Sequence, residues 1–176
     1  MSATPSFQRA RKPAEIEARR ETLLAAAATL FDEEGPQGAG LNAIAARAGF
    51  TKSNVYRYFE SREDVLLSLF RVELLAFAED LEAAFANCQP NDIDALATVV
   101  ADQFVTRPRL CALISILNLT LEQNVSEAAV VALKRSVVEV NQRLSAALHA
   151  RHRHDDSGDA RSDQHGTEDA RLAVAF

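Results

Sequence analysis

The side chains best suited to bind another molecule in this 176-residue chain lie in one short stretch, residues 52 to 58. Lys52, Asn54 and Arg57 carry donors and acceptors that can read base edges, because Lys and Arg pair with guanine and Asn pairs with adenine. Tyr56 and Tyr58 supply hydroxyl groups that can bond phosphate oxygens. The stretch contains no acidic residue, although the chain has a formal net charge of -6. This combination predicts a contact with nucleic acid.

A helix, a glycine turn and a second helix over residues 41 to 59 would position these side chains. Gly49 stands where the chain needs a left-handed residue, and the side chain of Thr51 is expected to cap the second helix. Val55 and Phe59, four residues apart, share the buried side of that helix, which leaves the polar side chains facing outward. The spacing predicts a helix-turn-helix, in which the start of the second helix meets base edges in the major groove.

The composition predicts an all-α fold. Hydrophobic residues make up 48% of the chain, with only six Gly and five Pro, and no convincing alternation of apolar and polar residues marks a strand. The amino terminus has no signal-peptide hydrophobic region, and no apolar run approaches the roughly 20 residues of a membrane span. Together with only two cysteines, these features place the protein in the cytoplasm with no membrane partner.

Apolar residues at intervals of three and four predict the further helices. The first runs from about residue 14 to 34, and later ones cover about 61–87, 92–106, 110–122 and 126–152. The helix at 110–122 is expected to carry Leu110, Ile114, Leu117 and Leu121 on one side. Ser61 caps the second of these, and Asp64 three residues later makes a variant of the capping box.

The helix predicted after Ser126 carries an unusually wide apolar stripe. The residues that recur near heptad spacing are Val130, Leu133, Val137, Val140, Leu144 and Leu148. A second line through Val131, Val138 and Ser145 widens the stripe beyond what one neighbouring helix would cover. We therefore expect a subunit interface; the alternative is a helix buried within its own domain. The predicted interface residues are Val130, Val131, Lys134, Val137, Val138, Asn141, Leu144 and Leu148.

The order and spacing of residues 15 to 70 resemble the amino-terminal domain of the TetR family of bacterial transcriptional regulators. The resemblance is carried by Ile44-Ala45, Ala48-Gly49-Phe50-Thr51, Val55-Tyr56, Tyr58-Phe59 and Ser61-Arg62-Glu63-Asp64-Val65-Leu66. Membership would imply an all-α homodimer with a three-helix DNA-binding head and a helical body, usually a repressor that leaves its operator when a small molecule binds the body.

The resemblance also assigns roles by position. The residues expected to face double-stranded DNA are Asn42, Lys52, Ser53, Asn54, Tyr56, Arg57, Tyr58 and Arg62. Lys52, Asn54 and Arg57 are the candidates for base contacts, whereas Tyr56, Tyr58 and Arg62 are assigned to the phosphate backbone. Gly40 stands where the family often has a threonine cap, and Ser53 stands where glycine or proline is frequent. Because of these departures, the resemblance does not predict the operator sequence.

The expected domains are a flexible basic arm at 1–13, a helix-turn-helix domain at 14–60, a ligand-binding and dimerisation domain at 61–154, a disordered linker at 155–166, and the start of a truncated C-terminal helix at 167–176. The effector is expected to be apolar or weakly polar. The residues expected to bind it are Phe77, Leu81, Phe104, Leu110, Ile114, Leu117, Asn118 and Leu121. Most residues of such a set also serve as ordinary core.

Other classes of function have less support in the sequence. His149, His152 and His154 cluster, but no cysteine or fixed carboxylate completes a site, so we expect no metal and no cofactor. The chain offers no phosphate loop, nucleophile elbow or paired catalytic carboxylates, so we do not expect an enzyme. The alternative is an architectural DNA-binding protein without a ligand. A cavity in the helical body would favour the ligand-released regulator over this alternative.

Overall fold

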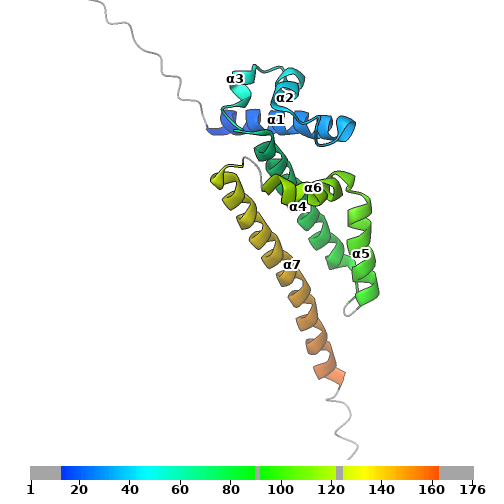
Figure 1. The fold of residues 1–176 in the computed structure, drawn as a ribbon. Coiled ribbons are helices and arrows are strands. Elements are labelled where there is room, and N and C mark those ends of the chain that lie inside the picture. Colours follow the sequence, from blue (N-terminus) through cyan, green and yellow to red (C-terminus); the bar gives the residue numbers. More distant parts are fainter. Residues whose placement is uncertain (1–12, 90–91, 122–124, 163–176) are drawn as a thin grey trace, which may run out of the picture. The chain divides into compact units, whose positions relative to one another are not determined.

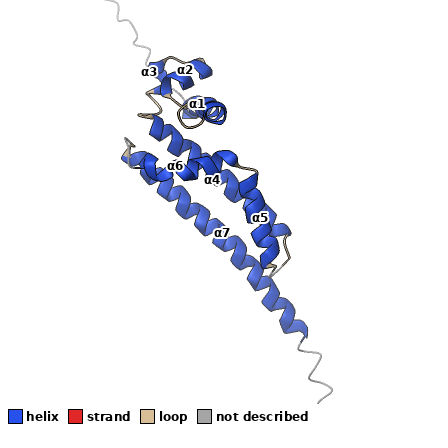
Figure 2. Cartoon of the chain, turned by 45° about the vertical axis from the view of Figure 1, so that its right-hand side comes forward, coloured by secondary structure: helices blue, strands red, loops and turns tan. Residues whose placement is uncertain are grey.

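The computed structural model describes residues 13–89, 92–121 and 125–162, and these segments are helices joined by turns (Figures 1 and 2). The helices are α1 (Pro13–Glu34), α2 (Leu41–Ala48), α3 (Lys52–Val55), α4 (Arg62–Asn87), α5 (Ile93–Val105), α6 (Pro108–Leu121) and α7 (Glu127–Ser162). No strand occurs in these ranges, in agreement with the all-α prediction. Over the same residues, no helix is both long and apolar enough to cross a membrane.

The chain divides into two compact units. The first combines residues 1–70 with 115–130, and the second combines 71–114 with 131–176. Helices α4, α6 and α7 each contribute one part to each unit. As a result, the helix-turn-helix elements and the first turn of α7 belong to the same unit.

Apolar side chains of the first four helices form the core of the first unit. Leu23 and Ala27 of α1, Ile44 of α2 and Val55 of α3 have no exposed surface. The spacing of four between the two α1 residues places them on one face. Burying a large aliphatic side chain of this kind contributes about 1.5–3 kcal/mol, so the short helices α2 and α3 depend on this core.

The loop from α1 to α2 folds back on the end of α1. The Gly38 N–H donates to the Gly35 carbonyl at 3.0 Å. A Cβ atom added at Gly38 would lie 2.5 Å from the Cβ of Glu34 and 2.8 Å from the carbonyl oxygen of Leu30. Only glycine permits this approach of the loop to the last turn of α1.

The second unit combines an apolar core with partly exposed ion pairs. Phe77 and Leu81 of α4 and Leu110 and Leu113 of α6 are buried. The ion pairs join helices: Arg143 of α7 with Glu82 of α4, Arg109 of α6 with Glu73 of α4, and Arg107 with Asp80 of α4. Arg143 donates two hydrogen bonds to Glu82, both of 2.8 Å, and these bonds hold the pKa of the Glu82 carboxyl below its ordinary value.

The course of the chain after residue 154 differs from the sequence prediction. Helix α7 continues to Ser162, although the loss of apolar residues predicted a disordered linker at 155–166. Polarity alone does not end a helix, because a helix already formed adds residues without a new nucleation step. Three predicted parts lie outside the described residues: residues 1–12 of the arm predicted at 1–13, the rest of the linker at 163–166, and the terminal helix predicted at 167–176.

Candidate nucleic-acid interface

The turn between α2 and α3 has the geometry expected of a helix-turn-helix. Gly49 ends α2 with φ of 71°, in the left-handed region, where a side chain would cost about 1–2 kcal/mol. Its N–H donates to Ala46, and the Phe50 N–H donates to the Ala45 carbonyl at 2.9 Å. These bonds satisfy carbonyls at the end of α2, and the predicted role of Gly49 is confirmed.

The second helix is shorter than predicted, and its cap is formed differently. Regular α-helix covers only Lys52–Val55, and the Thr51 side chain makes no cap hydrogen bond, so that prediction was wrong. The Thr51 carbonyl instead accepts from the N–H groups of Asn54 and Val55 at 2.9 and 3.3 Å. The Asn54 N–H, which would donate to a capping hydroxyl, is therefore already bonded to the main chain.

The chain nevertheless stays coiled after α3. The Arg57 N–H donates to the Asn54 carbonyl at 3.2 Å, and the N–H groups of Tyr58 and Phe59 donate to the Val55 carbonyl at 2.9 and 3.1 Å. We call residues 52 to 59 the recognition segment. Its two predicted anchors, Val55 and Phe59, are 0% and 3% exposed, so the direction of its outer face is determined.

Arg20 of α1 holds the end of the recognition segment in place. Its guanidinium lies 5.3 Å from the centroid of the Phe59 ring, and its Nη2 donates to Ser68 Oγ of α4 at 2.9 Å. Cation–π attraction and a charged hydrogen bond thus connect α1, the recognition segment and α4. The spacing of residues along α1 contains no signal for these partners of Arg20.

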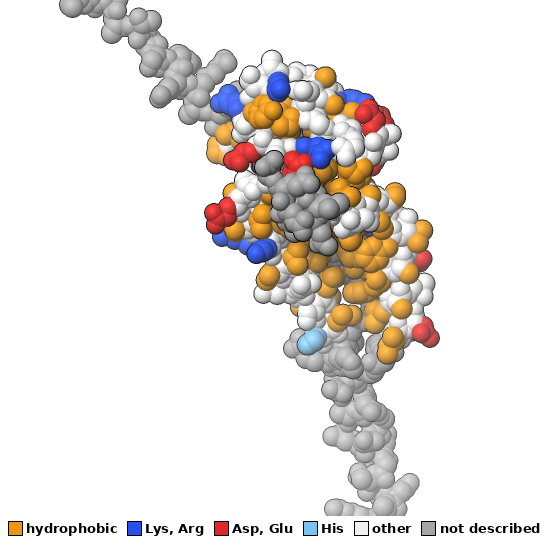
Figure 3. Space-filling model, viewed as in Figure 1, with side chains coloured by type: hydrophobic (Ala, Val, Ile, Leu, Met, Phe, Trp, Pro, Cys, Tyr) orange, Lys and Arg blue, Asp and Glu red, His pale blue; other side chains and the backbone are white. Residues whose placement is uncertain are grey.

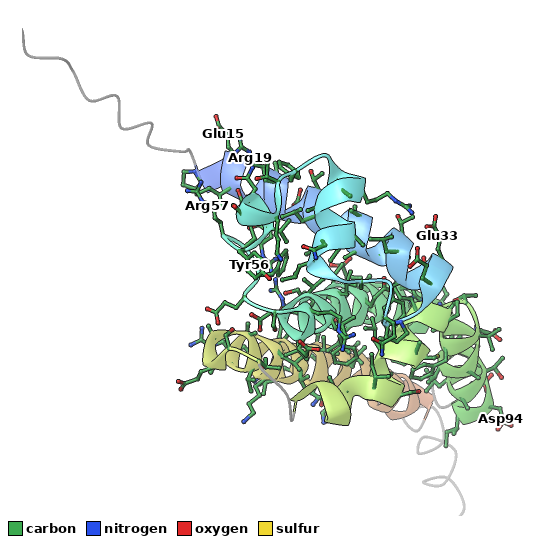
Figure 4. All side chains as sticks on the ribbon, turned by 45° about the horizontal axis from the view of Figure 1, so that its top comes forward. Glu15, Arg19, Glu33, Tyr56, Arg57 and Asp94 are labelled. Atoms are coloured by element: carbon green, nitrogen blue, oxygen red, sulfur yellow. The ribbon has the colours of Figure 1, made fainter. Side chains whose placement is uncertain are left out.

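The predicted DNA-facing side chains lie mainly on the surface. Asn42, Lys52, Ser53, Tyr56 and Arg57 are exposed, whereas Asn54, Tyr58 and Arg62 are half-buried. The Lys52 ammonium lies 5.7 Å from the centroid of the Tyr56 ring. Figure 4 shows Tyr56 and Arg57 extending from the segment that follows α3.

Two other cations of the first unit are bonded to protein groups. Arg47 donates to both carboxylate oxygens of Glu33, at 3.2 and 2.5 Å, and this bonding lowers the pKa of Glu33 and raises that of Arg47. Arg62 donates to Gln37 at 2.5 Å and to Glu63 at 2.9 Å. Among the described residues, neither Lys52 nor Arg57 forms an ion pair, so both charges are available to an anionic partner.

The capping box predicted after the recognition segment is present. The Asp64 N–H donates to Ser61 Oγ at 3.0 Å, and Asp64 Oδ2 accepts from the Glu60 N–H at 3.1 Å. The box fixes the start of α4 immediately after the recognition segment. Its return bond goes to Glu60 rather than to the cap residue itself, as it would in the usual form.

Sequence comparison identifies the family. Residues 23–69 match the profile described as "Bacterial regulatory proteins, tetR family", and residues 71–162, more than half of the chain, match the one described as "Tetracyclin repressor-like, C-terminal domain". The chain belongs to the TetR family. The first match covers the helix-turn-helix built above, and the second covers the helices that follow it.

Individual relatives agree with this TetR-family assignment. The chain is 27% identical over 126 residues to the "Fatty acid metabolism regulator protein" of Bacillus subtilis (strain 168), covering 72% of this chain and 58% of that protein. It is 32% identical over 83 residues to the "HTH-type transcriptional repressor KstR2" of Rhodococcus jostii (strain RHA1), covering 47% and 39%. The matches thus span less than two thirds of the length of either relative.

A solved structure shares the fold of this TetR-family chain. The fatty acid degradation regulator FadR from Bacillus halodurans superimposes with a TM-score of 0.50 at 22% identity, covering 74% of this chain and 69% of that one. At this level of identity the likeness shows a common all-α fold with an amino-terminal helix-turn-helix.

The residues predicted to bind an effector fall into two groups. Phe77, Leu81 and Leu110 are buried, whereas Phe104 and Ile114 are exposed. The rings of Phe77 and Phe104 lie 4.9 Å apart between centroids. Leu117 is half-buried, and the side chains of Asn118 and Leu121 lie outside the described ones. Helix α6 buries Leu110 and Leu113 and exposes Ile114, so only part of the predicted face is buried.

The residues predicted to form a dimer lie largely on the surface of α7. Val131, Val137, Val138 and Leu148 are exposed large hydrophobic residues, and Lys134 and Asn141 are exposed as well, whereas Val130 and Leu144 are half-buried. Leu133, Ser136 and Val140 instead form the buried side of the helix. The wide stripe therefore has one side in the core and one side in solvent. Figure 3 shows hydrophobic side chains gathered on the surface of the molecule.

Proposed function

We propose that this TetR-family protein is a cytoplasmic, sequence-specific transcription regulator, a homodimeric repressor that leaves its operator when a small molecule binds. The observation that carries the proposal is the recognition segment. Its inner side is anchored by Val55 and Phe59, and its outer side presents Lys52 and Arg57 without a carboxylate partner among the described residues.

Within this proposal, contacts divide into those that read sequence and those that set position. Lys52, Asn54 and Arg57 contact base edges in the major groove. Asn42, Tyr56, Tyr58 and Arg62 bind the phosphate backbone, and Ser53 adds a polar contact beside the bases. Arg62 would exchange its bond with Glu63 for one with a phosphate, which offers the same charge-assisted geometry.

The homodimer is proposed to form through the exposed side of α7. Four large hydrophobic side chains in solvent on one helix, Val131, Val137, Val138 and Leu148, favour burial against a second copy. A dimer would present two recognition segments, and DNA spaces equivalent half-sites by about 34–36 Å, one helical turn.

The effector is proposed to be apolar or weakly polar. The predicted binding residues are aliphatic and aromatic, and Phe77 and Phe104 are already in contact. A similar protein is named as a regulator of fatty acid metabolism, so fatty acids are the first compounds to test. The observations support neither a cofactor nor an enzymatic activity.

The alternative is an architectural DNA-binding protein without a ligand. Both functions would give salt-dependent binding, because both neutralise phosphates. Only the regulator would release its DNA on addition of a small molecule and would strongly prefer one sequence.

Selection of bound genomic fragments tests the proposal. Fragmented DNA of the source organism is incubated with the protein, bound duplexes are recovered, and each is titrated against its scrambled counterpart at two salt concentrations. We expect a preference of at least about 10³-fold for a recovered duplex. Fatty acids are then added to the complex. If no duplex is preferred over its scrambled counterpart, the regulator proposal fails.

A further inference from the structure

Asp64 is a buried carboxylate that serves the starts of two helices. It is 5% exposed. Besides the bonds of the capping box on α4, its Oδ1 accepts from the Ser126 N–H at 3.1 Å and from the Ser126 hydroxyl at 3.3 Å. Ser126 directly precedes α7, and its hydroxyl oxygen accepts from the Ala129 N–H at 3.2 Å. One side chain thus connects residues 62 positions apart in the sequence.

The same carboxylate also bonds the residue that directly follows the recognition segment. Its Oδ2 accepts from the N–H of Glu60 at 3.1 Å, the residue that follows Phe59. A hydrogen-bonded path therefore runs from Glu60 through Asp64 and Ser126 to Ala129. All four residues belong to the first unit, whereas α7 continues from residue 131 into the second.

The path includes the start of α7, because Ser126 directly precedes that helix. A negative charge is stabilised at a helix start, where the free N–H groups carry partial positive charge. A buried carboxylate that loses its donors carries a large desolvation cost. A shift of α7 that removed the bonds from Ser126 would leave Asp64 underbonded unless its side chain, and with it the Glu60 main chain, also moved.

We propose that the junction of Asp64 with Ser126 couples α7 to the recognition segment, with Asp64 as a positioning residue. When both bonds from Ser126 are in place, Glu60 is held and the recognition segment keeps its DNA-binding orientation. Displacement of the first turn of α7 breaks those bonds and releases the segment. This inference rests on the proposed function, because it assigns the route by which events in the body reach the DNA.

Three substitutions at Ser126 separate the junction from the ordinary cap of α7. Ser126→Asp keeps an acceptor for the Ala129 N–H, since Asp is a good cap residue, but places a second negative charge against Asp64. Ser126→Gly removes the hydroxyl and is also tolerated at a cap, so it serves if the first variant does not fold. Ser126→Thr retains the hydroxyl and should behave as wild type.

A matched control removes a cap elsewhere. Asp92 caps α5 by accepting from the Ala95 N–H at 2.8 Å and has no bond to Asp64. Hydrogen exchange of the full chain without DNA is measured for every variant. We expect Ser126→Asp to accelerate exchange several-fold at residues 54 to 60, and Asp92→Ala to accelerate it only in the first turn of α5. Faster exchange confined to the first turn of α7 in Ser126→Asp would overturn the coupling.

Reciprocity supplies the second measurement, since a site that affects DNA binding must in turn respond to DNA. With the duplex recovered by the wild-type protein, we expect exchange at Ala129 and Val130 to slow several-fold in wild type and Ser126→Thr but not in Ser126→Asp. Protection of the recognition segment by DNA without any slowing at Ala129 in wild type would overturn the coupling alone. Failure to recover any duplex would overturn the proposed function, and the coupling to DNA with it.

Discussion

Three arginines of the first unit should give three different signatures when each is changed to alanine. Arg57 is exposed and has no ion pair among the described residues, Arg62 is half-buried against Gln37 and Glu63, and Arg47 is paired with Glu33. We assign Arg57 to a base, Arg62 to a phosphate and Arg47 to neither. The three variants therefore test the orientation of the recognition segment rather than charge in general.

The expected magnitudes follow from these assignments. A lost bidentate base contact reduces discrimination by about 1–3 kcal/mol per site, or roughly 5- to 150-fold. Arg57→Ala should therefore lower the affinity for the recovered duplex by this factor per protomer. It should lower the affinity for a scrambled duplex much less. A lost phosphate contact lowers the slope of log K against log salt by about 0.9. For two protomers, Arg62→Ala should lower it by about 1.8, equivalent to roughly 12-fold between 50 and 200 mM salt.

Fluorescence anisotropy at four salt concentrations, on the recovered and the scrambled duplex, measures both quantities. Arg47→Ala is the matched control, since it removes the same charge from the same unit and should leave slope and discrimination nearly unchanged. The reasoning is refuted if Arg57→Ala weakens both duplexes equally and lowers the slope, because Arg57 would then contact the backbone. It is also refuted if Arg47→Ala behaves like either of the other two.

Three further predictions concern stability and assembly. Arg20→Ala should lower the free energy of unfolding by about 1–3 kcal/mol, because it removes the contact with the Phe59 ring and the hydrogen bond to Ser68; urea unfolding measures the loss, and an unchanged midpoint would contradict it. Because Arg143 lowers the pKa of Glu82, the stabilisation from this pair is complete above the ordinary glutamate pKa and is lost as the pH falls through the lowered value. Glu82→Gln should therefore flatten that part of the plot of unfolding free energy against pH. An identical plot for the variant and the wild type would argue against the pair. Val138→Asp should shift the protein from dimer to monomer in sedimentation equilibrium, whereas Ala146→Asp, exposed on the same helix but outside the predicted interface, should not; equal effects of the two would exclude this side of α7 as the interface.

Much of the helix-turn-helix was predictable because its signals are local. Gly49 was predicted from the need for a left-handed residue, and Val55 with Phe59 from a spacing of four. The structure confirms all three, together with the capping box of Ser61 and Asp64. The length of α3 was not predictable in the same way. The N–H groups of Asn54 and Val55 donate to the Thr51 carbonyl and not to its side chain. The presence of a threonine in the sequence does not predict which of its two oxygens will accept these hydrogen bonds.

The faces of the longer helices were only partly predictable. Periodicity placed Leu110 and Ile114 on the same side of α6, but the structure buries Leu110 with Leu113 and leaves Ile114 exposed. Spacings of three and four are both compatible with an apolar face, so the neighbouring helices decide between them. In α7, the sequence indicated a stripe wider than one neighbour could cover, and the structure shows which part of that stripe the chain itself buries.

The sequence by itself therefore determined the helical class, the turn and the polar face of the recognition segment, because each depends on residues no more than four positions apart. Only the tertiary structure decided what holds that segment. Arg20 meets Ser68 across 48 positions and Asp64 meets Ser126 across 62. Hydrogen bonds between such distant residues leave no periodic trace in a sequence, since they depend on how the helices pack and not on where a residue stands within its own helix.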